Sequence, residues 1–99
     1  MELTSQQNQK AVQRVLSVLN RFDLMGLEPG RPGGVPDDEY LPEASALVQV
    51  LAMNGAIDVD QLRHTWLEWL SDDLSGQPSD VLDDLVGALI KEFRIAIVE

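Results

Sequence analysis

Apolar residues recur at steps of three and four positions in four separate segments of this 99-residue chain. This spacing gathers apolar side chains on one face of an α-helix, and no segment keeps the alternation that is typical of a half-buried strand. The sequence therefore predicts an all-α fold, with residues 1–99 forming a single domain of four helices around one core. We expect the helices at about residues 4–22, 42–54, 59–71 and 80–96.

Local signals indicate where several of these helices begin and end. Asp58 can cap the third helix while Gln61, three residues later, completes a capping box. Gly55 is a typical residue just beyond a helix end, and it follows the second helix. Pro42 suits the first turn of that helix, and Ser79 is expected to cap the last one.

The third helix contains both tryptophans of the chain, Trp66 and Trp69. Because they are three residues apart, we expect them to share the face that packs on the core. The alternative is that one of them is an exposed aromatic anchor for a protein partner, because tryptophan is enriched at the energetic centres of interfaces.

A loop rich in glycine and proline is expected at residues 23–41, between the first two helices. Loops of nearly twenty residues are uncommon in small domains, and most are functional or packed as compact Ω-loops. We expect Asp23 to bond nearby loop amides, as aspartate does in turns. The side chains expected to attach the two ends of the loop to the core are Phe22, Leu24, Met25, Leu27 and Tyr40.

Negative charge is concentrated in the last two thirds of the chain. Residues 1–36 contain four bases and three acids, whereas residues 37–99 contain three bases and fourteen acids. Such a surface repels nucleic acids and anionic membranes and attracts a basic protein, although acidity also serves solubility alone. The candidate residues for contact with a basic partner are Asp37, Asp38, Glu39, Asp72, Asp73, Asp83 and Asp84.

The sequence does not contain a set of residues that is typical of an active site. With no cysteine in the chain, thiolate chemistry, zinc–thiolate sites and disulfides are excluded. The single histidine, His64, has Glu68 four residues later, which favours a surface pair over acid–base catalysis. The acid doublets could hold a hard cation only if the fold gathered them, because adjacent helical side chains point about 100° apart. We therefore expect neither an enzyme nor a metal or cofactor.

Two motif-like stretches fail for specific reasons. The run "PGRPGG" lacks the Gly-Lys-Ser/Thr that completes a phosphate-binding loop. The stretch "DVDQLRHTWLEW" has Arg63 and Trp69 where a calcium loop needs glycine and glutamate. The sequence also shows no secretory signal peptide and no apolar run long enough to span a membrane, so we expect a cytoplasmic protein.

The segment "VLNRFDLMGL", followed after a Gly/Pro gap by "PDDEY", resembles the small YugE-like family of bacterial proteins. That family has an Asn–x–aromatic–Asp–x–x–Gly segment followed by an acidic "DEY", although Phe22 and Leu24 stand where its pattern has tryptophan and proline. The resemblance covers residues 12–51 and implies no activity. The matching positions are Asn20, Phe22, Asp23, Gly26, Asp38, Glu39 and Tyr40.

Small acidic helical proteins of this type also resemble the immunity proteins of bacterial toxin systems, including contact-dependent growth inhibition. That resemblance implies a protein that binds a basic toxin domain, such as a nuclease, and occludes its active site. The first functional hypothesis is therefore an immunity protein. The alternatives are a housekeeping or regulatory interaction module, which could form a homodimer, and a metal-dependent enzyme built on the acid doublets.

Overall fold

The computed structural model describes residues 2–24, 26, 30–71 and 74–98, except for the side chain of Leu70. Four α-helices account for most of this part of the chain, and it contains no strand. The predicted all-α fold with four helices is confirmed, and each helix begins and ends within two residues of the expected position. The helices are α1 Ser5–Phe22, α2 Leu41–Asn54, α3 Val59–Leu70 and α4 Ser79–Val98.

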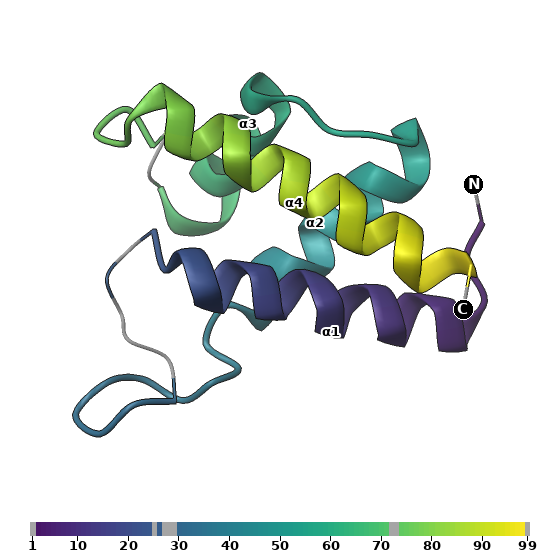
Figure 1. The fold of residues 1–99 in the computed structure, drawn as a ribbon, viewed down its shortest axis with the longest axis horizontal. Coiled ribbons are helices and arrows are strands. Elements are labelled where there is room, and N and C mark those ends of the chain that lie inside the picture. Colours follow the sequence, from purple (N-terminus) through teal and green to yellow (C-terminus); the bar gives the residue numbers. More distant parts are fainter. Residues whose placement is uncertain (1, 25, 27–29, 72–73, 99) are drawn as a thin grey trace.

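Helices α1 and α4 lie side by side and run in opposite directions, and they form the most extensive helix pair of the molecule (Figure 1). Helix α2 packs on α1, and α3 packs on α2. The start of α1 and the end of α4 therefore lie close together (Figure 1). Near those ends, the Nε2 atom of Gln7 donates a hydrogen bond of 3.1 Å to the carbonyl oxygen of Ile97.

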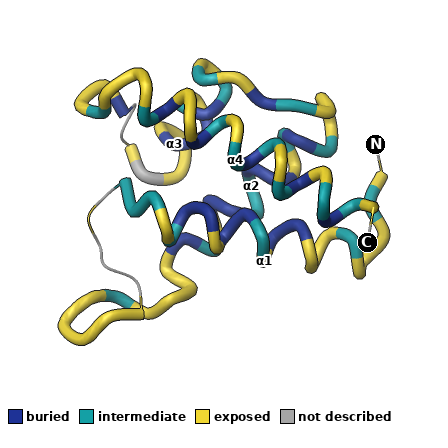
Figure 2. Tube along the Cα trace, viewed as in Figure 1, coloured by how far each residue is buried: buried dark blue, intermediate teal, exposed yellow. Residues whose placement is uncertain are grey.

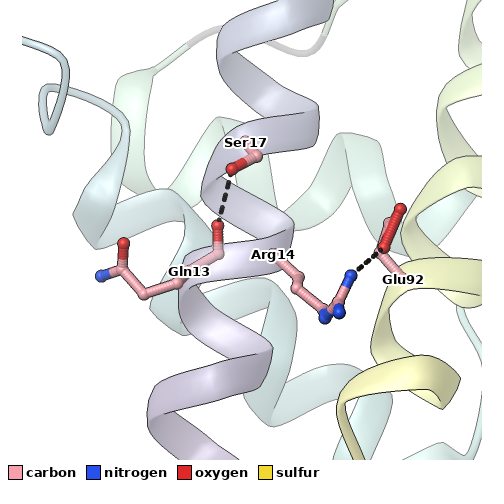
Figure 3. A network of polar contacts seen from close by, with 4 residues as sticks. All are labelled: Gln13, Arg14, Ser17 and Glu92. Atoms are coloured by element: carbon pink, nitrogen blue, oxygen red, sulfur yellow. Dashed lines mark hydrogen bonds and ion pairs between the residues drawn. The ribbon is translucent and has the colours of Figure 1, made fainter.

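A salt bridge joins α1 to α4 at the middle of their interface. The guanidinium of Arg14 lies 3.0 Å from a carboxylate oxygen of Glu92 (Figure 3). Both side chains are only partly buried, so solvent screens the pair and its contribution to stability is at most about 1 kcal/mol. The salt bridge therefore joins a base of the N-terminal region to an acid of the C-terminal region.

The core lies between the facing sides of the helices (Figure 2). The expected apolar stripes of α1, α2 and α4 are buried, apart from residues at their edges such as Phe22, Val86 and Ile97, which pack against the core while partly exposed. Full burial of one such side chain contributes roughly 1.5–3 kcal/mol. The largest fully buried side chains are Trp66, Tyr40, Phe93, Leu19, Leu47 and Leu51.

The helix ends follow the local signals of the sequence with one exception. The backbone N–H of Gln61 donates to the carboxylate of Asp58 at 2.8 Å, and the reciprocal bond completes the capping box. Gly55 ends α2 in the left-handed conformation. Ser79 is the first helical residue of α4 and not its cap, because the carbonyl of Pro78 already accepts a bond from the N–H of Leu82.

Candidate protein-binding surface

The long loop between α1 and α2 is attached to the rest of the protein at both ends. The hydroxyl of Tyr40 donates a hydrogen bond of 2.9 Å to the carboxylate of Asp23, which ends α1 in the left-handed conformation. The side-chain amide of Asn20 donates to the backbone carbonyl of Asp37 at 2.8 Å. These bonds fasten the exit of the loop to the last turn of α1, and so fix where the acids at that exit lie.

Tyr40 attaches the loop to the core as expected. Its side chain is almost completely buried, and its ring centroid lies 6.0 Å from that of Trp66 in α3. Phe22 and Leu24, at the other end of the loop, are partly buried against the core, whereas Met25 and Leu27 fall outside the described residues. Tyr40 therefore connects the loop, α1 and α3 through one side chain.

The tip of the loop is exposed but folded back on itself. The N–H of Gly30 donates to the carbonyl of Val35 at 2.9 Å, and the N–H of Gly34 donates to the carbonyl of Arg31 at 2.9 Å. Figure 2 shows the exposed tip projecting from the helices. The segment presents Arg31 to solvent, together with the acids that follow.

Five of the seven acids proposed from the sequence as partner contacts are described, and all five are exposed. Asp37, Asp38 and Glu39 lie at the exit of the loop, and Asp83 and Asp84 lie in the second turn of α4. Within the described part of the chain, none of these five carboxylates forms a salt bridge. Asp72 and Asp73 lie outside the described residues.

The loop and the first turns of α4 both lie toward the left end of the molecule in Figure 1, the loop below the end of α1 and the first turns of α4 above it. The segment that leads into α4 is also bonded to the start of the loop, because the side-chain amide of Gln77 donates to the carbonyl of Leu24 at 3.0 Å. The fold thus brings both acid groups to one end of the protein, although they are more than forty residues apart in sequence.

Helix α2 has an unusual solvent-facing side. Its only charged residue is Glu43, which is buried, so its exposed and half-buried positions carry no charge. Met53, at the C-terminal end of this side, is 78% exposed. Periodicity predicts which side of a helix faces the core, but it does not predict which residues of the other side form a binding surface.

The two tryptophans differ in exposure, and the expectation that both face the core is wrong for Trp69. Trp66 is fully buried, whereas Trp69 is 53% exposed. A step of three residues turns a helix by about 300°, so Trp69 lies about 60° from Trp66 around the axis. Helix α3 packs mainly on α2 and less on α4, so its buried stripe is too narrow to include Trp69.

An open depression of about 400 Å³ lies between α2 and α3, lined by Val50, Met53, Thr65, Glu68 and Trp69 among others. A second depression of about 360 Å³ shares Val50, Met53 and Thr65 and continues toward the start of α3. The two depressions adjoin at these three shared residues, and we call them together the α2–α3 groove. It combines exposed apolar side chains with acids at its edges, which is the composition of a protein-binding surface.

The described residues give no support to the metal site considered from the sequence. His64 and Glu68 are both exposed, and no hydrogen bond joins these two described side chains. Among the described residues, no three side chains of histidine, aspartate or glutamate lie close enough together to hold a metal ion. No described helix is long and apolar enough to cross a membrane.

Glu43 is the one carboxylate buried in the described core. Burial raises the pKa of Glu43 above its ordinary value of 4.5. A hydrogen bond from its own backbone lowers this pKa, and the nearby charge of Glu39 raises it, but burial is the largest effect. The Oε2 atom of Glu43 has no hydrogen-bond partner. The side chain is buried with this oxygen unpaired, so we assign Glu43 a cost in stability.

Comparisons of the chain with protein-family models, with curated proteins and with solved structures find no match.

Proposed function

We propose that this protein is an immunity protein that binds a cognate basic toxin domain and blocks its active site. The observation that carries the proposal is the group of exposed carboxylates at one end of the fold, at the loop exit and in α4, which form no salt bridges within the described residues. Carboxylates without internal partners are available to lysine and arginine side chains of another protein. If the toxin is a nuclease, these carboxylates would bind at the positions where the phosphates of its substrate bind.

Electrostatics gives this mode of binding a kinetic signature. Charges on the two proteins attract each other before contact, so association is fast at low salt and slows as salt screens the field. Individual exposed carboxylates contribute little to affinity, and most of their effect falls on the association rate. The bonds that fasten the loop exit support this role, because acids held in place lose less entropy on binding than acids on a free loop.

The test uses as the titrant the product of the adjacent gene, which the proposal expects to be a basic toxin domain. Calorimetry at low salt is expected to give a one-to-one complex, and co-production of the two proteins is expected to protect cells from the domain. The triple variant Asp37→Asn, Asp38→Asn, Glu39→Gln should bind about tenfold more weakly or worse. Absence of binding at low salt, or full protection by a variant that lacks all five described acids, would contradict the proposal.

A second candidate is a housekeeping or regulatory interaction module that forms a homodimer. The observation that favours it is the exposed apolar surface of α2 and α3, including Met53 and Trp69. Sedimentation equilibrium distinguishes the two candidates. A molecular mass that stays at 11.0 kDa over a wide concentration range rejects the homodimer.

A further inference from the structure

The side of α2 that faces solvent has the composition of an interface centre. Charged residues make up 24% of the chain, yet none occupies an exposed or half-buried position of this 14-residue helix. Protein interfaces are depleted of charge at their centre and enriched in methionine and aromatic residues. Met53 on α2 and Trp69 on α3 supply those two residue types next to the uncharged side.

The shape of the α2–α3 groove fits a helix. Ala46, Val50 and Met53 line its α2 wall at spacings of four and three residues, which places them in a row along roughly 10 Å of the helix axis. Trp69 and Thr65 form the facing wall on α3. A row of apolar contacts about two turns long between two helices suits an amphipathic helix with anchors at matching intervals.

The edges of the groove indicate the charge of its occupant. Asp60 and Glu68 line it from α3, and among its described lining residues there is no lysine or arginine. His64 is the remaining titratable group that lines it. Acids around an apolar centre favour lysine or arginine on the polar face of the occupant.

Charge also disfavours a second copy of this chain as the occupant. The chain has a net charge of −10, and a twofold interface would bring the same acid-edged groove of each copy against the other. Like charges facing each other across an interface reduce affinity. A cationic partner faces no such repulsion.

We propose that the α2–α3 groove docks a cationic amphipathic helix of the partner protein, with Met53 and Trp69 as the apolar contacts and Asp60 and Glu68 as the charged ones. The inference rests on the proposed function, because it assigns a second contact surface to the same basic partner. The exposed acids at the loop exit and in α4 attract the partner, and the groove holds one of its helices.

The test measures binding of a fluorescently labelled amphipathic peptide of leucine and lysine, about 15 residues long, with its leucines at helical spacing. A scrambled peptide of the same composition is the control for charge alone. We expect the amphipathic peptide to bind more tightly than the scrambled one. It should also protect tryptophan from acrylamide quenching, and the protected residue is Trp69 because Trp66 is already fully buried.

Two matched pairs of variants locate the site. Met53→Gln should weaken peptide binding about tenfold, whereas Val98→Gln, at a residue of similar exposure (81%) near the C-terminus, should leave it unchanged. Asp60→Asn should weaken peptide binding and reduce the dependence of that binding on salt, whereas Asp80→Asn should change neither. Both aspartates are exposed and lie in the first turn of a helix. Circular dichroism and thermal melting check that each variant folds.

Three results would overturn the inference: equal binding of the two peptides, equal effects within either pair of variants, or a dimer of the free protein that Met53→Gln dissociates. The two proposals can also fail separately. If Met53→Gln binds the basic toxin domain as tightly as the unaltered protein does, the groove is not used and the immunity function stands. If the peptide binds the groove but no basic toxin domain binds the protein, the immunity function fails.

Discussion

Among single residues, Tyr40 does most to organise the surface that we propose to be functional. Its hydroxyl bonds Asp23 and its ring lies against Trp66, so one side chain joins the loop, α1 and α3. The resemblance noted in the sequence includes Asn20, Asp23 and Tyr40, and all three contribute to fastening the loop. The contacts of those positions are therefore explained by the architecture of the loop.

Replacing Tyr40 by phenylalanine should lower the free energy of unfolding by about 1–3 kcal/mol, because it removes a hydrogen bond to a carboxylate and leaves the ring in place. Chemical denaturation measures the change. The control is a double-mutant cycle with Asp23→Gly, since glycine has no side-chain acceptor and adopts the left-handed backbone found at this position. A coupling energy near zero would show that the Tyr40–Asp23 bond does not contribute to stability.

The raised pKa of Glu43 predicts a specific dependence of stability on pH. Because its pKa is raised in the folded protein, the folded state binds the proton more tightly than the unfolded state does. Protonation of Glu43 therefore stabilises the folded state. This stabilisation is complete below the pKa that Glu43 has in the unfolded state, and it is lost as pH rises through the pKa that Glu43 has in the folded state. Glu43→Gln should therefore be more stable than the unaltered protein at pH 7, with a difference that shrinks as the pH falls toward 4.

Denaturation of both proteins at several pH values measures this difference and cancels the effect of the other acids. A difference that stays constant from pH 7 to pH 4 would mean that Glu43 does not titrate with a raised pKa. A variant less stable than the unaltered protein at pH 7 would mean that the carboxylate has a partner that stabilises its charged form.

At the scale of helices and loops, the sequence predicts where elements lie better than which of their sides are exposed. The capping box of Asp58 and Gln61 and the stop at Gly55 are local signals, and both are confirmed. The Tyr40–Asp23 bond joins residues that are seventeen positions apart in sequence, and no periodic pattern predicts such a contact. The uncharged side of α2 was not predicted either, because its apolar residues surround much of the helix and a pattern cannot tell which of them meet solvent.

Two glycines in helical surroundings should respond oppositely to alanine. Gly55 has φ of +75° at the end of α2, whereas Gly87 lies in the body of α4, and a Cβ at either position would meet no atom within 4 Å. Gly87→Ala should stabilise the protein by about 0.5–1 kcal/mol through helix propensity, and Gly55→Ala should destabilise it by about 1 kcal/mol through backbone strain.

Thermal melting of the two alanine variants gives the sign of each effect directly. Because the space around both positions is open, packing cannot account for a difference between them. Destabilisation by Gly87→Ala would contradict the helical backbone at that position, and stabilisation by Gly55→Ala would contradict the left-handed end of α2.

At the scale of the whole molecule, the fold places exposed acids that are far apart in the sequence toward one end of the protein. The helical fold was predicted from the sequence, which also shows directly which residues are acidic. The sequence could not predict that the loop exit and the start of α4 lie at the same end, since that depends on the packing of α1 against α4 and on the bond from Gln77 to Leu24. Trp69 shows the same limit, because its exposure depends on how far α4 covers α3.

The central claim is that this acidic end attracts a basic protein domain, and the association rate tests it most directly. Stopped-flow mixing with the product of the adjacent gene is expected to give a rate constant that falls roughly tenfold or more between low salt and about 0.3 M salt. Neutralising Asp37, Asp38 and Glu39 together should lower the low-salt rate and flatten this dependence. A rate that does not change with salt, or that the three substitutions leave unaltered, would contradict the claim.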